Sequence, residues 1–155
     1  MILYFFASIS IVFTSMVIGA IINGMIEKKA VYNYFSNLQF IKEDFVYKII
    51  GIKCIKWLVY KTFWEKFNPN IRSKSKPRLD ELISLKHEMT KAEVSHLIAF
   101  VIVVLVSFVV LKYILKFMLI LNFINIVFNL YPALLQQMNK KRVDSLIKMK
   151  KLNTK

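Results

Sequence analysis

Cysteine, glycine and proline are all scarce in this chain of 155 residues, which holds one cysteine, three glycines and three prolines. The single cysteine, Cys54, excludes an internal disulfide, and no spacing of cysteines and histidines is typical of a zinc site. Few glycines and prolines leave few turn signals, so long uninterrupted elements are expected. Acidic residues are also few, because nine Asp and Glu stand against 23 Lys and Arg, for a net charge of +14.

Hydrophobic residues, in contrast, make up 57% of the chain, and the mean hydropathy of +0.51 is high for a soluble protein. In a soluble protein, so large a positive charge would suggest nucleic acid as a partner. Beside long apolar runs, a membrane face with anionic lipids is the simpler cause, and no nucleic-acid partner is expected. The sequence predicts an all-α integral membrane protein with about three transmembrane helices and a cytoplasmic, partly interfacial helical segment, in a single membrane domain over residues 1–155.

The first predicted span is residues 1–26, which contain no charged side chain. A helix of this length would extend about 39 Å, enough for a bilayer core of about 30 Å. A cleaved signal peptide is the alternative, since residues 15–20 offer small side chains to a peptidase, but no basic residues precede the apolar run.

Residues 97–135 form a longer apolar stretch, and its only charges are Lys112 and Lys116. One unbroken helix over this stretch would measure about 58 Å, nearly twice the thickness of the bilayer core. The sequence therefore predicts a transmembrane hairpin that turns near these two lysines.

The basic residues predict the orientation of these spans. Residues 27–96 hold fourteen Lys and Arg against eight Asp and Glu, and the tail over residues 136–155 holds seven Lys and Arg. By the positive-inside rule, both segments are predicted to be cytoplasmic in a multi-pass protein of the cell membrane, with Met1 and the hairpin turn outside.

Within the long polar segment, residues 45–64 mix lysines with aromatic side chains. This mixture favours either a helix lying among lipid headgroups or an amphipathic helix packed on the protein. Residues 68–78 contain two prolines and small polar residues, and are predicted to be a linker. A helix is predicted to begin near Leu79 and to continue through the polar cluster before the hairpin.

That cluster contains Glu88, Glu93 and His96, which a helix places within side-chain reach of one patch. Solvated charges at a helix end are one interpretation. A metal site is a second, since Glu-x-x-His is half of a di-iron motif, but no second Glu-x-x-His is present, so neither metal nor cofactor is expected. A third is a general base, with a carboxylate orienting His96 to take a proton from a hydroxyl group.

The third predicted span carries amides, which are costly at membrane depth unless they are paired. Asn122 and Asn125 are predicted to form hydrogen bonds between helices. A polar stripe is predicted to continue from the bilayer into the cytoplasm along Asn129, Gln136, Asn139 and Arg142. Such donors suit a lipid headgroup, a sugar or a thioester carbonyl.

Two stretches of the chain resemble motifs of one family. Residues 88–96 read E-M-T-K-A-E-V-S-H and resemble the pattern E-T-x-x-A-E-x-x-H. Residues 129–142 read N-L-Y-P-A-L-L-Q-Q-M-N-K-K-R and resemble N-L-x-P-x-x-x-Q-R-Y-N-R-x-R. Both patterns occur, in this order and around an apolar stretch, in the bacterial glycosyl-4,4'-diaponeurosporenoate acyltransferase family. Its members are small membrane proteins that place a fatty acyl chain on the sugar of a glycosylated carotenoid.

The resemblance covers roughly residues 45–146 and includes departures from the family patterns. Met89 stands where the family has Thr, Gln137 and Met138 replace Arg and Tyr, and Lys141 stands where Pro is common. Because these changes lie beside the candidate site, they bear on the substrate more than on the fold.

The resemblance implies transfer of an acyl group to a hydroxyl of a glycolipid, with acyl-CoA, acyl carrier protein or a phospholipid as the donor. His96 would be the general base, oriented by Glu93 or Glu88. Substrates would be bound by Asn129, Gln136, Asn139 and Arg142, with Arg142 or Asn139 stabilising the oxyanion. The alternatives are a family member that acts on another glycolipid and a non-catalytic membrane protein, such as an immunity protein or a subunit of a complex.

Overall fold

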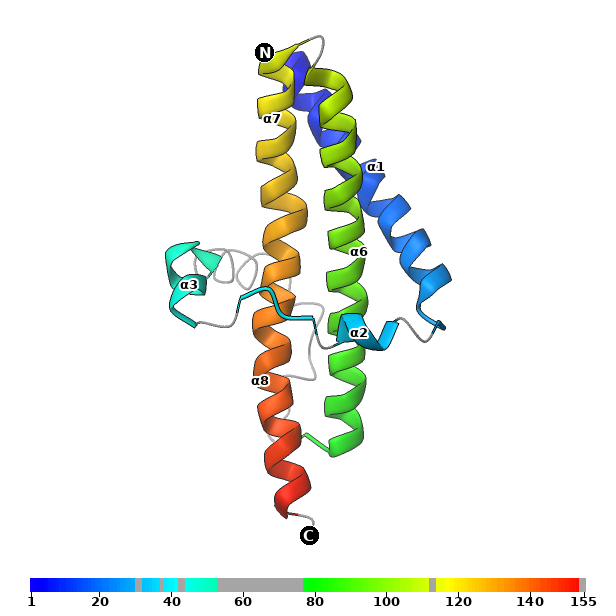
Figure 1. Ribbon diagram of the computed structural model, residues 1–155, viewed down its shortest axis with the longest axis vertical. Helices are drawn as coiled ribbons and strands as arrows, with labels where there is room; N and C mark the ends of the chain where they lie inside the picture. Colours follow the sequence, from blue (N-terminus) through cyan, green and yellow to red (C-terminus); the bar gives the residue numbers. More distant parts are fainter. Residues whose placement is uncertain (30–31, 37, 42–43, 53–76, 112–113, 154–155) are drawn as a thin grey trace.

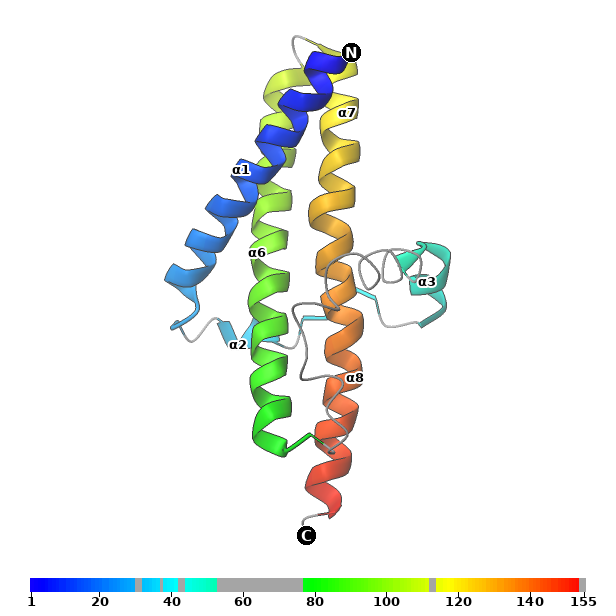
Figure 2. The ribbon, with the colours of Figure 1, turned by 180° about the vertical axis from the view of Figure 1, so that it is seen from behind.

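The computed structural model describes residues 1–29, 32–36, 38–41, 44–52, 77–111 and 114–153, and every element in these ranges is helical. Helix α6 (Leu79–Leu111) lies beside a rod that consists of α7 (Leu115–Asn125), η3 (Ile126–Leu130) and α8 (Tyr131–Asn153) (Figure 1). The rod and α6 run in opposite directions. Helix α1 (Ile2–Ile26) begins at the end of the molecule where α6 meets α7, and it slants across α6 (Figure 2). The C-terminus lies at the opposite end.

Three helices are long and apolar enough to cross a membrane, by length and composition. They are Ile2–Ile26, Leu79–Val110 and the continuous rod Leu115–Leu152. Large apolar side chains are exposed on all three, as expected for helices surrounded by lipid; examples are Leu3, Val17, Ile21, Leu105, Phe108, Leu119 and Phe123. The predicted all-α architecture with three such helices is therefore confirmed, and helix α6 begins at Leu79 as the periodicity indicated.

The buried face of α1 consists mainly of small and polar residues. Its members, spaced three or four apart, are Ser8, Val12, Ser15, Gly19 and Asn23. A Cβ atom on Gly19 would lie 2.5 Å from the carbonyl oxygen of Ser95, so only glycine lets α1 approach the α6 backbone this closely. Small residues are the usual means of such contact between membrane helices. Ser15 and Gly19, two of the small residues of 15–20, thus have a packing role.

The rod is kept continuous through Pro132 by a turn of π-helix, η3. The N–H group of Tyr131 bonds to the carbonyl of Ile126, five residues earlier, instead of four. In an α-helix, the proline ring would crowd the carbonyl of Phe128 and would offer it no N–H donor. A wider π turn before the proline relieves this conflict, so the rod continues into α8 without a break.

Two short helices lie near the middle of the molecule. Helix α2 (Tyr32–Ser36) packs on α6, and α3 (Asp44–Ile49) stands out to the side of the rod (Figure 1). Tyr47 and Ile52 are buried against the Leu134 side of α8. The hydroxyl of Tyr131 also donates to the carbonyl of Ile50 at 2.9 Å. Residues 44–52 therefore pack on the protein, although Phe45 and Ile49 remain exposed.

Several predictions concern residues outside the described ranges. They are the rest of the segment that mixes lysines with aromatic side chains, residues 53–64, most of the predicted linker over residues 68–78, and Cys54. The membrane depth of each segment also remains a prediction.

Candidate active site

The interface between α6 and α8 brings together the two polar clusters that flank the apolar stretch. As residue numbers rise along α6 they fall along the rod, in the order Lys86 with Asp144, Glu93 with Lys140 and Gln137, His96 with Asn129, and Phe100 with Asn125. The antiparallel arrangement thus produces a continuous polar seam between two apolar helices.

At one end of this seam, a chain of amides determines which nitrogen of His96 carries its proton. The side-chain Nδ2 of Asn125 donates to the carbonyl oxygen of Phe100 at 3.1 Å. Because that carbonyl can only accept, the orientation of the Asn125 amide follows, and its Oδ1 accepts from Nδ2 of Asn129 at 2.8 Å. The Oδ1 of Asn129 is then the atom that faces Nδ1 of His96, at 3.4 Å.

An oxygen acceptor at Nδ1 requires the proton of the neutral imidazole to lie on that nitrogen. The lone pair is therefore on Nε2, which makes no hydrogen bond within the described part of the chain. Asn125 and Asn129 are fully buried, whereas His96 is half-buried. The buried amides thus set the tautomer of His96 and leave its basic nitrogen at Nε2.

Farther along the seam, Glu93 forms a buried ion pair. The Nζ of Lys140 lies 2.5 Å from one oxygen of the carboxylate, and Nε2 of Gln137 donates to the other at 2.7 Å. Lys140 also donates to the carbonyl of Phe35, and the N–H of Phe40 donates to Oε1 of Gln137. The pair is nearly inaccessible to solvent, so both charges depend on these contacts.

The structure does not bring the predicted orienting carboxylates to His96. Glu93 is engaged by Gln137 and Lys140, and Asn129 occupies Nδ1 of the imidazole. Glu88 lies eight residues before His96, about 12 Å along the helix axis. Its exposed side chain contacts Lys91 at 3.8 Å. In the described ranges, no three His, Cys, Asp or Glu side chains cluster as metal ligands would.

The residues of the predicted polar stripe along α8 also lie far from one another. Asn139 and Arg142 lie about 15 and 20 Å from Asn129 along the axis, too far for an oxyanion donor beside His96. Each step of three residues turns about 60° backward around the helix, so Arg142 ends about 140° away from Asn129. Gln136 is buried, Asn139 is half-buried and Arg142 is exposed.

Gln137 and Lys140 were not among the predicted site residues, and Asn125 was predicted to have only an interhelical role. Asn125 does bond across to α6, but Asn122 bonds to the carbonyl of Met118 in its own helix. A signal for Lys140 existed in the sequence, because a carboxylate on a packed helix face requires a cation opposite it. The carbonyl of Phe35 had no sequence signal.

A second group of charges joins the end of α1 to α6 outside the seam. Nε2 of His87 and Oε1 of Glu27 lie 2.8 Å apart, and Lys91 lies 3.5 Å from the same oxygen. The hydrogen bond with His87 is the main cause that lowers the pKa of Glu27 below its ordinary value, and the charge of Lys91 acts in the same direction. Nearby, Nδ2 of Asn23 donates to the carbonyl of Lys91. His87 is thus part of a structural contact, distant from Asn129.

Comparison with known proteins identifies one family. The family model described as glycosyl-4,4'-diaponeurosporenoate acyltransferase matches residues 29–149, which include α2, α3, α6 and nearly all of the rod. Neither the curated proteins nor the solved structures contain a match to this chain. The matched region includes the entire polar seam.

Proposed function

Because this chain belongs to the glycosyl-4,4'-diaponeurosporenoate acyltransferase family, we propose that it is a membrane O-acyltransferase that joins a fatty acyl chain to a sugar hydroxyl of a carotenoid glycoside. The donor is an activated acyl group, and the acceptor is a glycolipid whose apolar part remains in the bilayer. The three apolar helices support this assignment, since both the acyl chain and the carotenoid partition into lipid.

One observation carries the proposal: the amide chain from Phe100 through Asn125 and Asn129 directs the lone pair of His96 to Nε2. A general base needs a free lone pair in a fixed direction. In this scheme Asn129 is the orienting residue. Glu93 positions α6 against α8 through Lys140, and Glu88 takes no part in proton transfer.

The proposed reaction moves one proton and exchanges one bond. The acceptor hydroxyl gives its proton to Nε2 of His96 while its oxygen forms an ester bond to the acyl carbonyl carbon. The bond between that carbon and the leaving atom of the donor breaks, and the imidazolium returns the proton to the leaving group. No acyl-enzyme is required, because no nucleophile motif such as G-x-S-x-G is present.

The polar residues farther along α8 are assigned to substrate parts distant from the reacting carbon. Gln136, Asn139 and Arg142 lie about 10 to 20 Å from Asn129, on the side of the C-terminus. At this distance they suit the sugar or a polar headgroup. The departures from the family patterns at Gln137 and Met138 fall in the same region, so a different glycolipid acceptor is the second candidate.

The test is mass spectrometry of lipids and pigments from cells that make the glycosylated carotenoid. With the intact protein, we expect a species heavier by one fatty acyl unit. His96→Ala should abolish it, whereas His87→Ala, which changes the other histidine, should retain it. If His96→Ala, expressed at equal level, makes the same product, His96 is not the base. If the intact protein changes no glycolipid, the non-catalytic alternative is favoured.

A further inference from the structure

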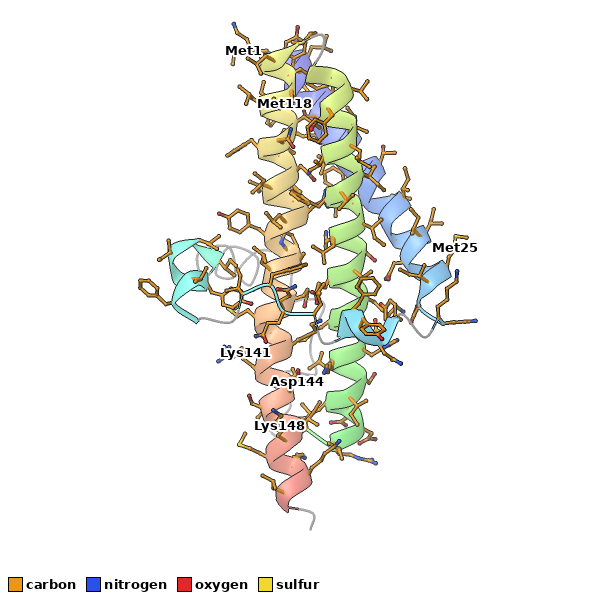
Figure 3. All side chains as sticks on the ribbon, in the orientation of Figure 1. Met1, Met25, Met118, Lys141, Asp144 and Lys148 are labelled. Atoms are coloured by element: carbon orange, nitrogen blue, oxygen red, sulfur yellow. The ribbon has the colours of Figure 1, made fainter. Side chains whose placement is uncertain are left out.

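An apolar groove of about 300 Å³ is bounded by Ile26 at the end of α1, by Phe35 of α2, and by side chains of α6 within residues 94–102. Every side chain that lines it is a hydrocarbon. Figure 3 labels Met25, the neighbour of Ile26, and shows it on the opposite side of α6 from Lys141 of α8. Because α6 is long and apolar enough to cross a membrane, the groove would open to lipid.

This groove is separate from the polar seam between α6 and α8. Val94 and Ile98 lie two residues before and after His96, and each is about 160° around the helix from it. His96 faces Asn129 of the rod, so the groove and the proposed base lie on opposite faces of α6. An occupant of the groove is therefore not placed for acyl transfer, and the groove requires a ligand of its own.

The dimensions of the groove determine what fits it. Residues 94–102 extend about 12 Å along α6, so the volume of about 300 Å³ corresponds to a mean cross-section of about 25 Å². An α-helix with its side chains is about 10–12 Å across and needs several times this cross-section. A single hydrocarbon chain fits, because an extended chain advances about 1.2 Å per bond and about ten carbons then cover the groove.

The end of the groove at Val94 lies beside a group of charges on α1 and α6. Lys91 stands three residues before Val94, one helical turn, on the same face. Its Nζ lies 3.5 Å from Oε1 of Glu27 and 3.8 Å from Oε1 of Glu88. Nε2 of His87 contacts Glu27 as well. Both acids at this end of the groove therefore already have partners.

Lys28 and Lys29 add positive charge at the same end. They follow Ile26, which lines the groove, by two and three residues. Both are exposed, and neither forms an ion pair within the part of the chain that the structure describes. Together with Lys91, they outnumber the two acids of this group. The positive-inside rule predicts that this segment is cytoplasmic, where the leaflet carries anionic lipids.

We propose that this groove binds one acyl chain of an anionic phospholipid from the bilayer, with the phosphate of its headgroup at Lys28 and Lys29. The chain covers apolar surface such as Val101, which is 54% exposed, and the phosphate gives the two lysines an opposite charge. Because the groove is built from α1, α2 and α6, the bound lipid stabilises the packing of these three elements. This binding site does not depend on the proposed acyltransferase function.

The experiment uses the whole chain in phosphatidylcholine vesicles that contain a trace of a phospholipid with a photoreactive diazirine in one acyl chain. Two probes with the same chains are compared, phosphatidylglycerol and phosphatidylcholine, and mass spectrometry of peptides locates the crosslinks. In the native protein, the anionic probe should label residues 94–102 at least about fivefold more than the neutral probe, since one interfacial lysine contributes about this factor. Lys28→Gln with Lys29→Gln should reduce the preference below about twofold. Lys116→Gln with Lys148→Gln removes equal charge elsewhere and should retain it.

A second pair of variants tests whether the acyl chain occupies the groove. Val101→Trp fills the groove, and Val109→Trp makes the same change eight residues farther along α6, outside it. Both valines are more than half exposed, so neither change has to disturb helix packing. Labelling of residues 94–102 by the anionic probe should fall at least about fivefold in Val101→Trp and stay within about twofold in Val109→Trp.

Equal labelling of residues 94–102 by the two probes in the native protein would overturn the proposal, and this comparison needs no variant. The proposal also fails if the anionic probe labels residues 94–102 no more than Leu105 and Val109, which are exposed on the same helix, because the lipid is then an ordinary neighbour. Unchanged labelling in Val101→Trp would refute the acyl-chain site. An unchanged preference in the Lys28 and Lys29 variant would refute the headgroup site.

Discussion

At the scale of single residues, Asn129 is the most important position, because its side chain connects the buried amide of Asn125 to the imidazole of His96. Its Oδ1 faces Nδ1 of His96, and its Nδ2 is held by Asn125. The orientation of both amides traces back to the carbonyl of Phe100, a group that can only accept. In the proposed function, the role of His96 as the base therefore depends on these buried amides.

Replacing Asn129 with Ala should lower kcat by about 10²-fold or more, because general-base catalysis of this kind contributes 10²- to 10⁴-fold. The direct readout is ¹⁵N NMR of the two histidines. The native His96 should be protonated on Nδ1, and Asn129→Ala should give a mixture of tautomers. Asn122→Ala is the matched control, since among the described residues that amide bonds only within its own helix, and it should leave the tautomer unchanged. A native spectrum with the proton on Nε2 would refute the orientation.

The ion pair between Glu93 and Lys140 gives a separate prediction about stability. Removing one partner takes away the nearest opposite charge from a buried charged group, so Glu93→Leu or Lys140→Met alone should lower the free energy of unfolding by about 3–5 kcal/mol. The double variant should lose less than the sum of the two. Denaturant titration in detergent measures all three. Additive losses would show that the two side chains do not act as a pair.

At the scale of elements, the approach of α1 to α6 depends on a single glycine. Gly19→Ala would place a Cβ against the Ser95 carbonyl and should destabilise the protein by about 1–3 kcal/mol. Gly24→Ala is the control, since nothing lies within 4 Å of the added Cβ. Glycine is unfavourable in a helix interior, so this change should be neutral or stabilising by up to about 1 kcal/mol. Equal effects of the two changes on thermal unfolding would contradict the packing described.

Sequence periodicity was sufficient for the helices but not for their contacts. The beginning of α6 at Leu79 and the three long apolar helices follow from hydrophobic spacing within each segment. Which residues of α6 meet which residues of α8 depends on packing between segments, which no local pattern encodes. The predicted stripe turns away from Asn129 toward Arg142, because each step of three residues adds about 60° of rotation around the helix. The π turn before Pro132 reflects a conflict resolved only in three dimensions.

At the scale of the whole molecule, the positions of the two ends of the rod give a prediction about how the chain crosses the membrane. The start of α7 and the end of α8 lie at opposite ends of the rod (Figures 1 and 2). In a background with Cys54→Ser, Lys116→Cys and Met149→Cys should react with an impermeant maleimide from opposite sides of the membrane. The positive-inside rule predicts that Met149→Cys is labelled from the cytoplasm. Labelling of both from one side would contradict the predicted membrane hairpin.

The candidate site depends on structure at all three scales. Antiparallel helices bring two polar clusters into one seam, and the seam brings buried amides to a histidine. The apolar groove lies on the opposite face of α6 from this seam. In the proposed enzyme, His96 at this seam would act as the base.

The most direct test of this account is the rate of acyl transfer by the purified protein in vesicles, compared between His96→Gln and His87→Gln. The account predicts a loss of about 10²-fold or more for His96→Gln, in keeping with the contribution of a general base. His87→Gln should stay within about twofold of the native rate, because His87 contacts Glu27 and not the amide chain. A folded His96→Gln protein that transfers acyl groups at the native rate would contradict the assignment of His96 as the base.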